Sequence, residues 1–299
     1  MADRIGELAA LGTAFLWTLT YIQFTFAVRR LGPSVLNRLR LLAALVLLLI
    51  AHTILSGLPV PLDVGWAEIG WLSLSGVIGF AVSDGFLFSA LLHLGAHRTS
   101  LVMSLIPITS AALSWAAFGE RLSGVQIAAG LITVGGIMLV VSARRSEGTE
   151  AGKRGLGIGV LFALGAVAAQ SLRYIFSVQG MRGGLPPLSA NVLQIGSATV
   201  AIWLFAVIRG TAKTSFAGLR NRGAFWATAG GACTGPFLGV TLSMVALTRA
   251  PVGIASTLMA LSPVFLLPAS RIAFKEPITP RAVVGTLLAV AGVALLFLY

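Results

Sequence analysis

Asp84 and Arg173 are charged side chains that stand within long apolar stretches of this sequence, Asp84 well inside its stretch and Arg173 in the outer third of its own. Ionised groups within a hydrocarbon layer are costly, so they are usually paired or functional. Asp84 is the only acidic residue well inside such a stretch, and Arg40 is expected at a similar depth on the preceding one. The two are therefore candidates for a gating or proton-coupling pair. A fixed ion pair, or a helix cap at residues 83–85, is the structural alternative.

Arg173 belongs to a polar stripe on an otherwise apolar helix. Gln170, Arg173, Tyr174 and Ser177 are spaced i, i+3, i+4 and i+7, which places them on one helix face. The planar guanidinium of arginine suits a carboxylate. The stripe is therefore a candidate binding surface for a substrate carboxylate. Alternatively, Arg173 extends to the lipid headgroups at the near membrane surface.

Trp17 stands at the middle of the first apolar stretch, although tryptophan prefers membrane interfaces. It shares a helix face with Thr13, Thr20 and Tyr21, which follow the same helical spacing. With Phe80, these side chains could line a cavity beside the apolar part of a substrate. Aromatic packing between helices is the competing interpretation.

Two prolines, Pro107 and Pro263, lie deep in apolar stretches, and each follows a methionine by four residues, Met103 and Met259. Proline cannot donate a hydrogen bond to the carbonyl four residues earlier. Within lipid, such a carbonyl needs a protein partner or a water-filled cavity. The pattern predicts two kinks that line a central cavity. The alternative is a pair of packing kinks inherited from one ancestral unit.

The sequence offers little for metal or enzyme chemistry. His93 and His97 are spaced four apart, but no HExxH pattern or neighbouring carboxylate accompanies them. An intramembrane enzyme would need clustered acidic or histidine side chains at membrane depth. No phosphate-binding loop is present, so ATP is not a direct energy source. We expect no enzyme activity, no metal and no cofactor; a lipid-binding scaffold is a further alternative.

The elements that carry these residues are predicted to be transmembrane helices. The chain has 299 residues, of which 57% are hydrophobic and 10% charged, against about 25% charged in soluble domains. The apolar stretches are about 20 residues long, which is enough to span a bilayer. The predicted fold is all-α and polytopic, with ten spans at residues 7–28, 34–55, 66–91, 99–118, 123–142, 155–178, 188–208, 222–247, 251–273 and 279–298.

The net charge of +12 follows the positive-inside rule rather than indicating a nucleic-acid partner. With ten spans, sixteen Lys and Arg residues fall on one side of the membrane and four on the other, Arg173 lying within a span. The basic side is predicted to be the cytoplasm. Both termini should then be periplasmic in a bacterial inner membrane, with a charged cytoplasmic linker at residues 143–154.

A sequence repeat divides the chain into two halves. Residues 90–120 align without a gap to residues 246–276, 156 positions later, and ten of the 31 pairs are identical. The predicted units are a first repeat at residues 1–142 and a second at residues 155–299. Since each has five spans, the two must cross the membrane in opposite directions, an architecture typical of transporters.

The chain resembles the drug/metabolite transporter superfamily of the two-domain EamA type over nearly its whole length. The residues that carry this resemblance are Trp17, the run at 40–44, Pro107, the run at 119–122, Gly130, Gly135 and Gly136, echoed by Pro263, Glu276, Gly285 and Gly292. Lys275 departs from the pattern, because glycine precedes the matching Glu120.

This resemblance implies a secondary transporter, and an exporter of neutral amino acids, aromatic ones included, is the favoured type. Alternating access around a central cavity would then move a small-molecule substrate across the bilayer. Protons are a candidate coupling partner, and a monomer is expected because two fused repeats can close a pathway. Efflux of drugs, nucleosides or sugars on the same scaffold is the alternative function.

Overall fold

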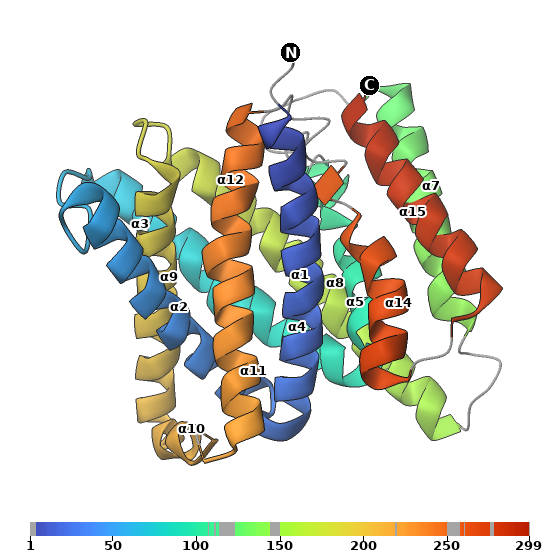
Figure 1. The fold of residues 1–299 in the computed structure, drawn as a ribbon, viewed down its shortest axis with the longest axis horizontal. Helices are drawn as coiled ribbons and strands as arrows, with labels where there is room; N and C mark the ends of the chain where they lie inside the picture. The colour runs from blue at the N-terminus through green and yellow to red at the C-terminus, as the bar shows by residue number, and fades with distance from the viewer. Residues whose placement is uncertain are drawn as a thin grey trace.

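The computed structural model describes residues 4–106, 108–110, 112–113, 123–143, 150–218, 220–249, 258–259, 261–275 and 278–298. Within these ranges the regular structure is entirely helical, which confirms the predicted all-α class (Figure 1). Among the described residues, five helical segments are long and apolar enough to cross a membrane, and three shorter apolar helices accompany them. The protein is therefore a multi-pass membrane protein.

The first half contains helices at all five predicted positions. Its second predicted span begins with Pro33 in the first turn of a helix, where the missing N–H costs nothing. The described elements are α1 (Ile5–Leu31), α2 (Pro33–Ser56), α3 (Trp66–Gly76), η1 (Val77–Ser83), α4 (Asp84–Leu94), α5 (Ala96–Met103) and α7 (Gly124–Ala143).

The second half follows the same order and adds one short helix that the sequence pattern did not predict, α10. The elements are α8 (Glu150–Gly180), α9 (Pro187–Ile208), α10 (Ala212–Gly218), α11 (Arg222–Ala232), η3 (Cys233–Gly239), α12 (Val240–Arg249), α14 (Ser262–Phe274) and α15 (Pro280–Leu298).

The third span of each repeat contains a π-helical segment, η1 in the first and η3 in the second. Their first residues, Val77 and Cys233, are 156 positions apart, as are their last residues. The sequence analysis predicted continuous α-helices here. Pro236 explains η3, because proline lacks the N–H that an α-helix requires. Segments of this type are frequent at functional sites.

Each π-segment is held by an asparagine from the second helix of its own repeat. Asn37 donates from Nδ2 to the carbonyl of Ala81 at 3.0 Å. Asn191 donates to the carbonyl of Pro236 at 3.4 Å. A carbonyl that has lost its α-helical partner needs another donor inside a membrane, and the two amides supply it.

The first helix of each repeat packs into the other repeat. Helix α1 contacts α11, η3, α12 and α14, whereas α8 contacts α3, η1, α4 and α5. Small residues allow the close approach: Gly235 faces Thr20 of α1, and Gly79 faces Arg173 of α8. The two repeats are therefore interlocked, and both first helices run beside a π-segment of the opposite repeat.

The last helices, α7 and α15, form a pair at one side of the bundle (Figure 1). A Cβ atom at Gly136 would lie 2.5 Å from the Gly285 carbonyl oxygen, and one at Gly292 would lie 2.7 Å from the Ala129 carbonyl oxygen. Gly136 and Gly292 are also 156 positions apart. Glycine is required at these crossings because the two backbones nearly touch.

Pro263 does not kink a continuous helix, and this corrects the sequence-based expectation. It lies in the first turn of α14, after a turn at Leu261. A proline there replaces an N–H that would have had no helical partner. The chain makes a similar turn at Ser104 and Leu105 in the first repeat. Pro107 lies outside the described residues.

Candidate functional site

Arg40 and Asp84 form a buried ion pair between α2 and the third span. Arg40 is 3% exposed, and its Nη2 contacts the Asp84 carboxylate. The same nitrogen donates to the Phe80 carbonyl at 3.2 Å, and Nε donates to Asn37 Oδ1 at 3.1 Å. The helix continues through residues 83–85, so the helix-cap alternative for Asp84 is wrong.

Aromatic rings enclose the Arg40 guanidinium. Its central carbon lies 5.1 Å from the ring centroid of Phe88 and 5.8 Å from that of Phe24. Phe24 and Phe88 meet edge to face at 5.3 Å. Cation–π attraction and exclusion of water both strengthen the ion pair here.

Arg173 is held between two aromatic rings. Its guanidinium carbon lies 4.3 Å from the centroid of Phe80 and 5.3 Å from that of Tyr174. Nε is 3.3 Å from Gln194 Oε1. Within the described part of the chain, its two terminal nitrogens have no hydrogen-bond acceptor. The outer end of the guanidinium is thus fixed in position and available for another anion.

A small network of polar side chains from three helices holds Arg173 in position. Gln194 Nε2 donates to Ser177 Oγ at 2.8 Å, and Ser177 lies one turn after Arg173 on α8. Ser75 Oγ donates to the Arg173 carbonyl at 2.9 Å and lies 3.1 Å from Ser177 Oγ. Gly79 leaves the space that the Arg173 side chain occupies.

The two arginines and the single carboxylate give the cluster an excess positive charge. Asp84 interacts electrostatically with both Arg40 and Arg173. Tyr21 of α1 lies within electrostatic range of Asp84 and of Tyr174. An anionic group would therefore complement the cluster, since an unmatched cation at membrane depth is costly.

The remaining residues of the α1 stripe face the second repeat. Thr20 Oγ1 is 2.8 Å from Thr234 Oγ1, which in turn donates to Gln23 Oε1 at 2.9 Å. A Cβ atom at Gly239 would lie 2.9 Å from Trp17 Nε1, so Trp17 packs on η3. This contact agrees with the aromatic-packing interpretation of Trp17.

The structure does not bring the two methionines to the arginine cluster. Met259 is 9% exposed and packs with Trp17, Ala9 and Ala10, whereas Met103 borders a separate core of α5, α7, α8 and α15. Gln170 is half-buried on α8. The predicted site therefore divides into a central cluster, at Tyr21, Arg40, Phe80, Asp84, Arg173 and Tyr174, and separate packing positions.

Sequence reasoning missed the residues that hold the arginines. Asn37 and Gln194 each bind an arginine directly. The sequence did contain a signal for a polar cluster, because two polar residues three positions apart share a helix face. Asn37 precedes Arg40 by three residues, and Asn191 precedes Gln194 by three in the matching helix. The contacts with Ser75 have no such signal, because they join separate helices. Among the described residues, no three or more His, Cys, Asp or Glu side chains gather as a metal site.

Comparison with known proteins gives similarities of sequence and of fold. The sequence model of the EamA-like transporter family matches residues 4–142 and again residues 157–298. A solved structure titled "Crystal structure of protein" has a TM-score of 0.64 at 20% identity, covering 97% of this chain and 95% of that one. That likeness shows a shared fold. A search of the curated proteins found no match.

Proposed function

Because the chain belongs to the EamA-like transporter family, we propose that it is a secondary transporter, an exporter of neutral amino acids that include aromatic ones. The observation that carries this proposal is the Arg173 guanidinium, held between Phe80 and Tyr174 with its terminal nitrogens unbonded. A substrate carboxylate would receive two parallel hydrogen bonds from this end. The neighbouring rings suit an apolar side chain.

The proposed mechanism is alternating access between two repeats, residues 1–142 and 155–299, joined by the linker at 143–154. The interlocked first helices support it, because any rocking of one repeat moves a helix that lines the other. The Asp84 side chain is 13% exposed and Arg173 is partly exposed. Charged groups at membrane depth face the bundle interior rather than lipid, which supports a central path beside them.

Asp84 and Arg40 are the proposed gating or coupling pair. Two cations, Arg40 and Arg173, act on the single Asp84 carboxylate. A substrate carboxylate bound to Arg173 would therefore leave Asp84 with Arg40 alone and change the balance of this cluster. Protonation of Asp84 would release Arg40 and weaken the contact between α2 and α4. This role predicts that a pH gradient drives uptake and that Asp84→Asn loses the gradient dependence while retaining exchange.

The test is uptake of radiolabelled Phe, Met, Leu and Thr into proteoliposomes, with and without a pH gradient. Arg173→Gln should lower the uptake efficiency for phenylalanine about tenfold or more, because a charge-assisted hydrogen bond is lost. Phenethylamine, which lacks the carboxylate, should be a poor competitor of phenylalanine uptake by the unmodified protein. The matched control is Arg182→Gln, an exposed arginine at the end of the same span, which should leave uptake unchanged.

Three outcomes would change the assignment. If saturable uptake is equal for Arg173→Gln and Arg182→Gln, Arg173 does not bind the substrate carboxylate. Uptake that ignores the gradient would make the protein a facilitator and Asp84 a structural residue. No uptake of any amino acid by folded protein would overturn this substrate class in favour of drugs, nucleosides or sugars.

A further inference from the structure

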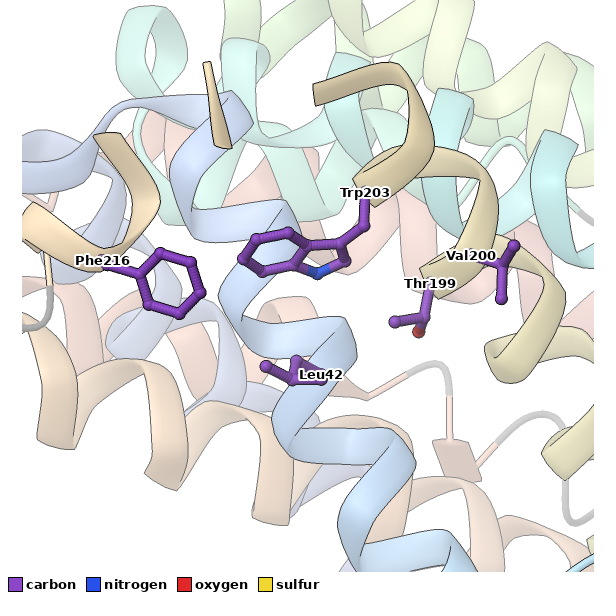
Figure 2. Close-up of a pocket in the computed structure, with 5 residues that line it drawn as sticks. All are labelled: Leu42, Thr199, Val200, Trp203 and Phe216. Carbon is purple, nitrogen blue, oxygen red and sulfur yellow. The ribbon is translucent and has the colours of Figure 1, made fainter. Parts of the chain in front are cut away.

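A lipid-facing groove lies between α2, α9 and α10, away from the arginine cluster (Figure 2). It has a volume of about 320 Å³ and is lined by Leu42, Thr199, Val200, Trp203 and Phe216. The rings of Trp203 and Phe216 are neighbours in its wall, with centroids 5.5 Å apart and planes tilted by 45°. The Thr199 hydroxyl donates to the Ile195 carbonyl at 2.7 Å, so its proton is not available to a ligand. The groove therefore presents an apolar surface to the bilayer.

The groove lies at one end of the bundle, which the predicted topology assigns to the cytoplasmic boundary of the membrane. Helix α9 ends at Ile208, and the short helix α10 packs against α2 and α9 at that end of the bundle (Figure 1). Lys213 and Phe216 are three residues apart on α10, so they share a face. Lys213 is exposed. An apolar chain in the groove would thus end beside a cation.

A second cation lies beneath the groove on α2. Arg38 is one turn before Leu42 and is 4% exposed. Its Nη1 donates to the carbonyl and to the hydroxyl of Thr211, both at 3.0 Å, which fixes the start of α10. Within the described part of the chain, Nη2 has no hydrogen bond and no carboxylate neutralises this guanidinium. A buried cation without a counter-ion is costly and favours a bound anion.

Trp203 adds a second unpaired donor. Its Nε1 is buried, and it has no hydrogen-bond partner in the described part of the chain. Tryptophan N–H groups in the boundary region of a bilayer normally meet the polar part of a lipid. Together, an apolar groove, an unpaired indole, the exposed Lys213 and the buried Arg38 match a molecule with an apolar chain and an anionic head.

We propose that this groove binds one acyl chain of an anionic phospholipid, whose phosphate lies at Arg38 and Lys213. The phosphate oxygens would accept from Arg38 Nη2 and from the Lys213 ammonium. The proposed site is independent of the transport function, since none of its lining residues contributes to the arginine cluster.

The test is native mass spectrometry of the full chain in detergent, titrated with phosphatidylglycerol or phosphatidylcholine of identical acyl chains. Phosphatidylglycerol should bind at least about fivefold more tightly, and Lys213→Gln should remove about fivefold of that preference. Val200→Trp, which fills the groove, should weaken both lipids. Arg271→Gln removes an exposed arginine on α14, which does not pack on α10, and it should change neither.

Each contrary result contradicts the proposal. Equal binding of the two lipids by the unmodified protein would show that the groove does not select an anionic head. If Lys213→Gln and Arg271→Gln weaken phosphatidylglycerol equally, the preference reflects overall charge. If Val200→Trp leaves both affinities intact, the acyl chain does not occupy the groove.

Discussion

Arg40 is bonded through two of its guanidinium nitrogens, Nε and Nη2. It contacts a carboxylate, a backbone carbonyl and an amide oxygen at once. Removing two charges from water costs several kcal/mol per ion, and their attraction offsets this only when the remaining polar atoms are also satisfied. That condition is met at Arg40. The pair should therefore stabilise the local packing of α2 on α4, whatever its role in transport.

A double-mutant cycle tests this stabilising role of the pair. Arg40→Met and Asp84→Asn should each lower the free energy of unfolding by about 3–5 kcal/mol, because each leaves one buried partner unmatched. The double variant should lose clearly less than the sum, since no unmatched charge remains. Thermal melting in detergent measures all four proteins. Strictly additive losses would show that the two residues do not interact.

Gly79 provides a way to displace Arg173 without removing it. A Cβ atom at Gly79 would overlap Cδ of Arg173, whose flexible side chain can move away. Gly79→Ala should therefore lower phenylalanine uptake about as strongly as Arg173→Gln, with a small change in melting temperature. Gly85→Ala is the control, because no atom lies within 4 Å of its Cβ position. Normal uptake by Gly79→Ala would mean that the position of Arg173 is not critical.

At the scale of helices, the structure shows which features the two repeats share. Both have a π-segment in the third span, held by an asparagine from the second helix. They differ where their first helices meet the opposite π-segment. Arg173 packs on Gly79, whereas Thr20 packs on Gly235. The packing scheme is therefore symmetric, while the charge that would bind a substrate is present on one side only.

The pairing of α7 with α15 makes a prediction at this scale. Gly136→Leu should lower the melting temperature, because its side chain would meet the backbone of Gly285 and Ala289; overpacking costs about 1–3 kcal/mol. The neighbouring Gly135 has no atom within 4 Å of its Cβ position. Gly135→Leu should then leave the melting temperature unchanged. Equal effects of the two substitutions would contradict the close contact.

For the whole molecule, the interlocked repeats and the positive-inside bias together predict an orientation. Sixteen basic residues were assigned to the cytoplasmic side of the predicted topology. The loop between α2 and α3 should then be periplasmic, and the segment between α9 and α11 should be cytoplasmic. Both termini would lie in the periplasm of a bacterial inner membrane.

Single cysteines test this orientation. In a Cys233→Ala background, which removes the only native cysteine, Val60→Cys should react with an impermeant maleimide added to intact cells. Thr214→Cys should react after the cells are permeabilised. Both positions are exposed. The opposite pattern would show that the protein has the inverse orientation in the membrane. Labelling of both cysteines in intact cells would contradict the predicted number of spans between them.

Much of the fold was predictable because its signals are local. Apolar stretches of membrane-spanning length are properties of contiguous residues, and each predicted span contains helix where the structure describes it. The π-segments escaped prediction, because an extra residue in a turn rotates the helix face, and a span that is apolar on all sides carries no face pattern that would record the rotation. Pro263 was misplaced for a related reason: proline is compatible with a kink or with a helix start, and the turn at Leu261 is decided by packing against α1.

The sequence by itself determined the class of protein, its helices, its internal repeat and the identity of the charged residues at membrane depth. These follow from the cost of placing polar groups in hydrocarbon, which acts residue by residue. Only the tertiary structure decided that Arg173 lies between Phe80 and Tyr174, that Gln194 holds it, and that Met259 lies apart from it. Such contacts join helices distant in sequence, and the crossing of α1 and α8 into opposite repeats determines them.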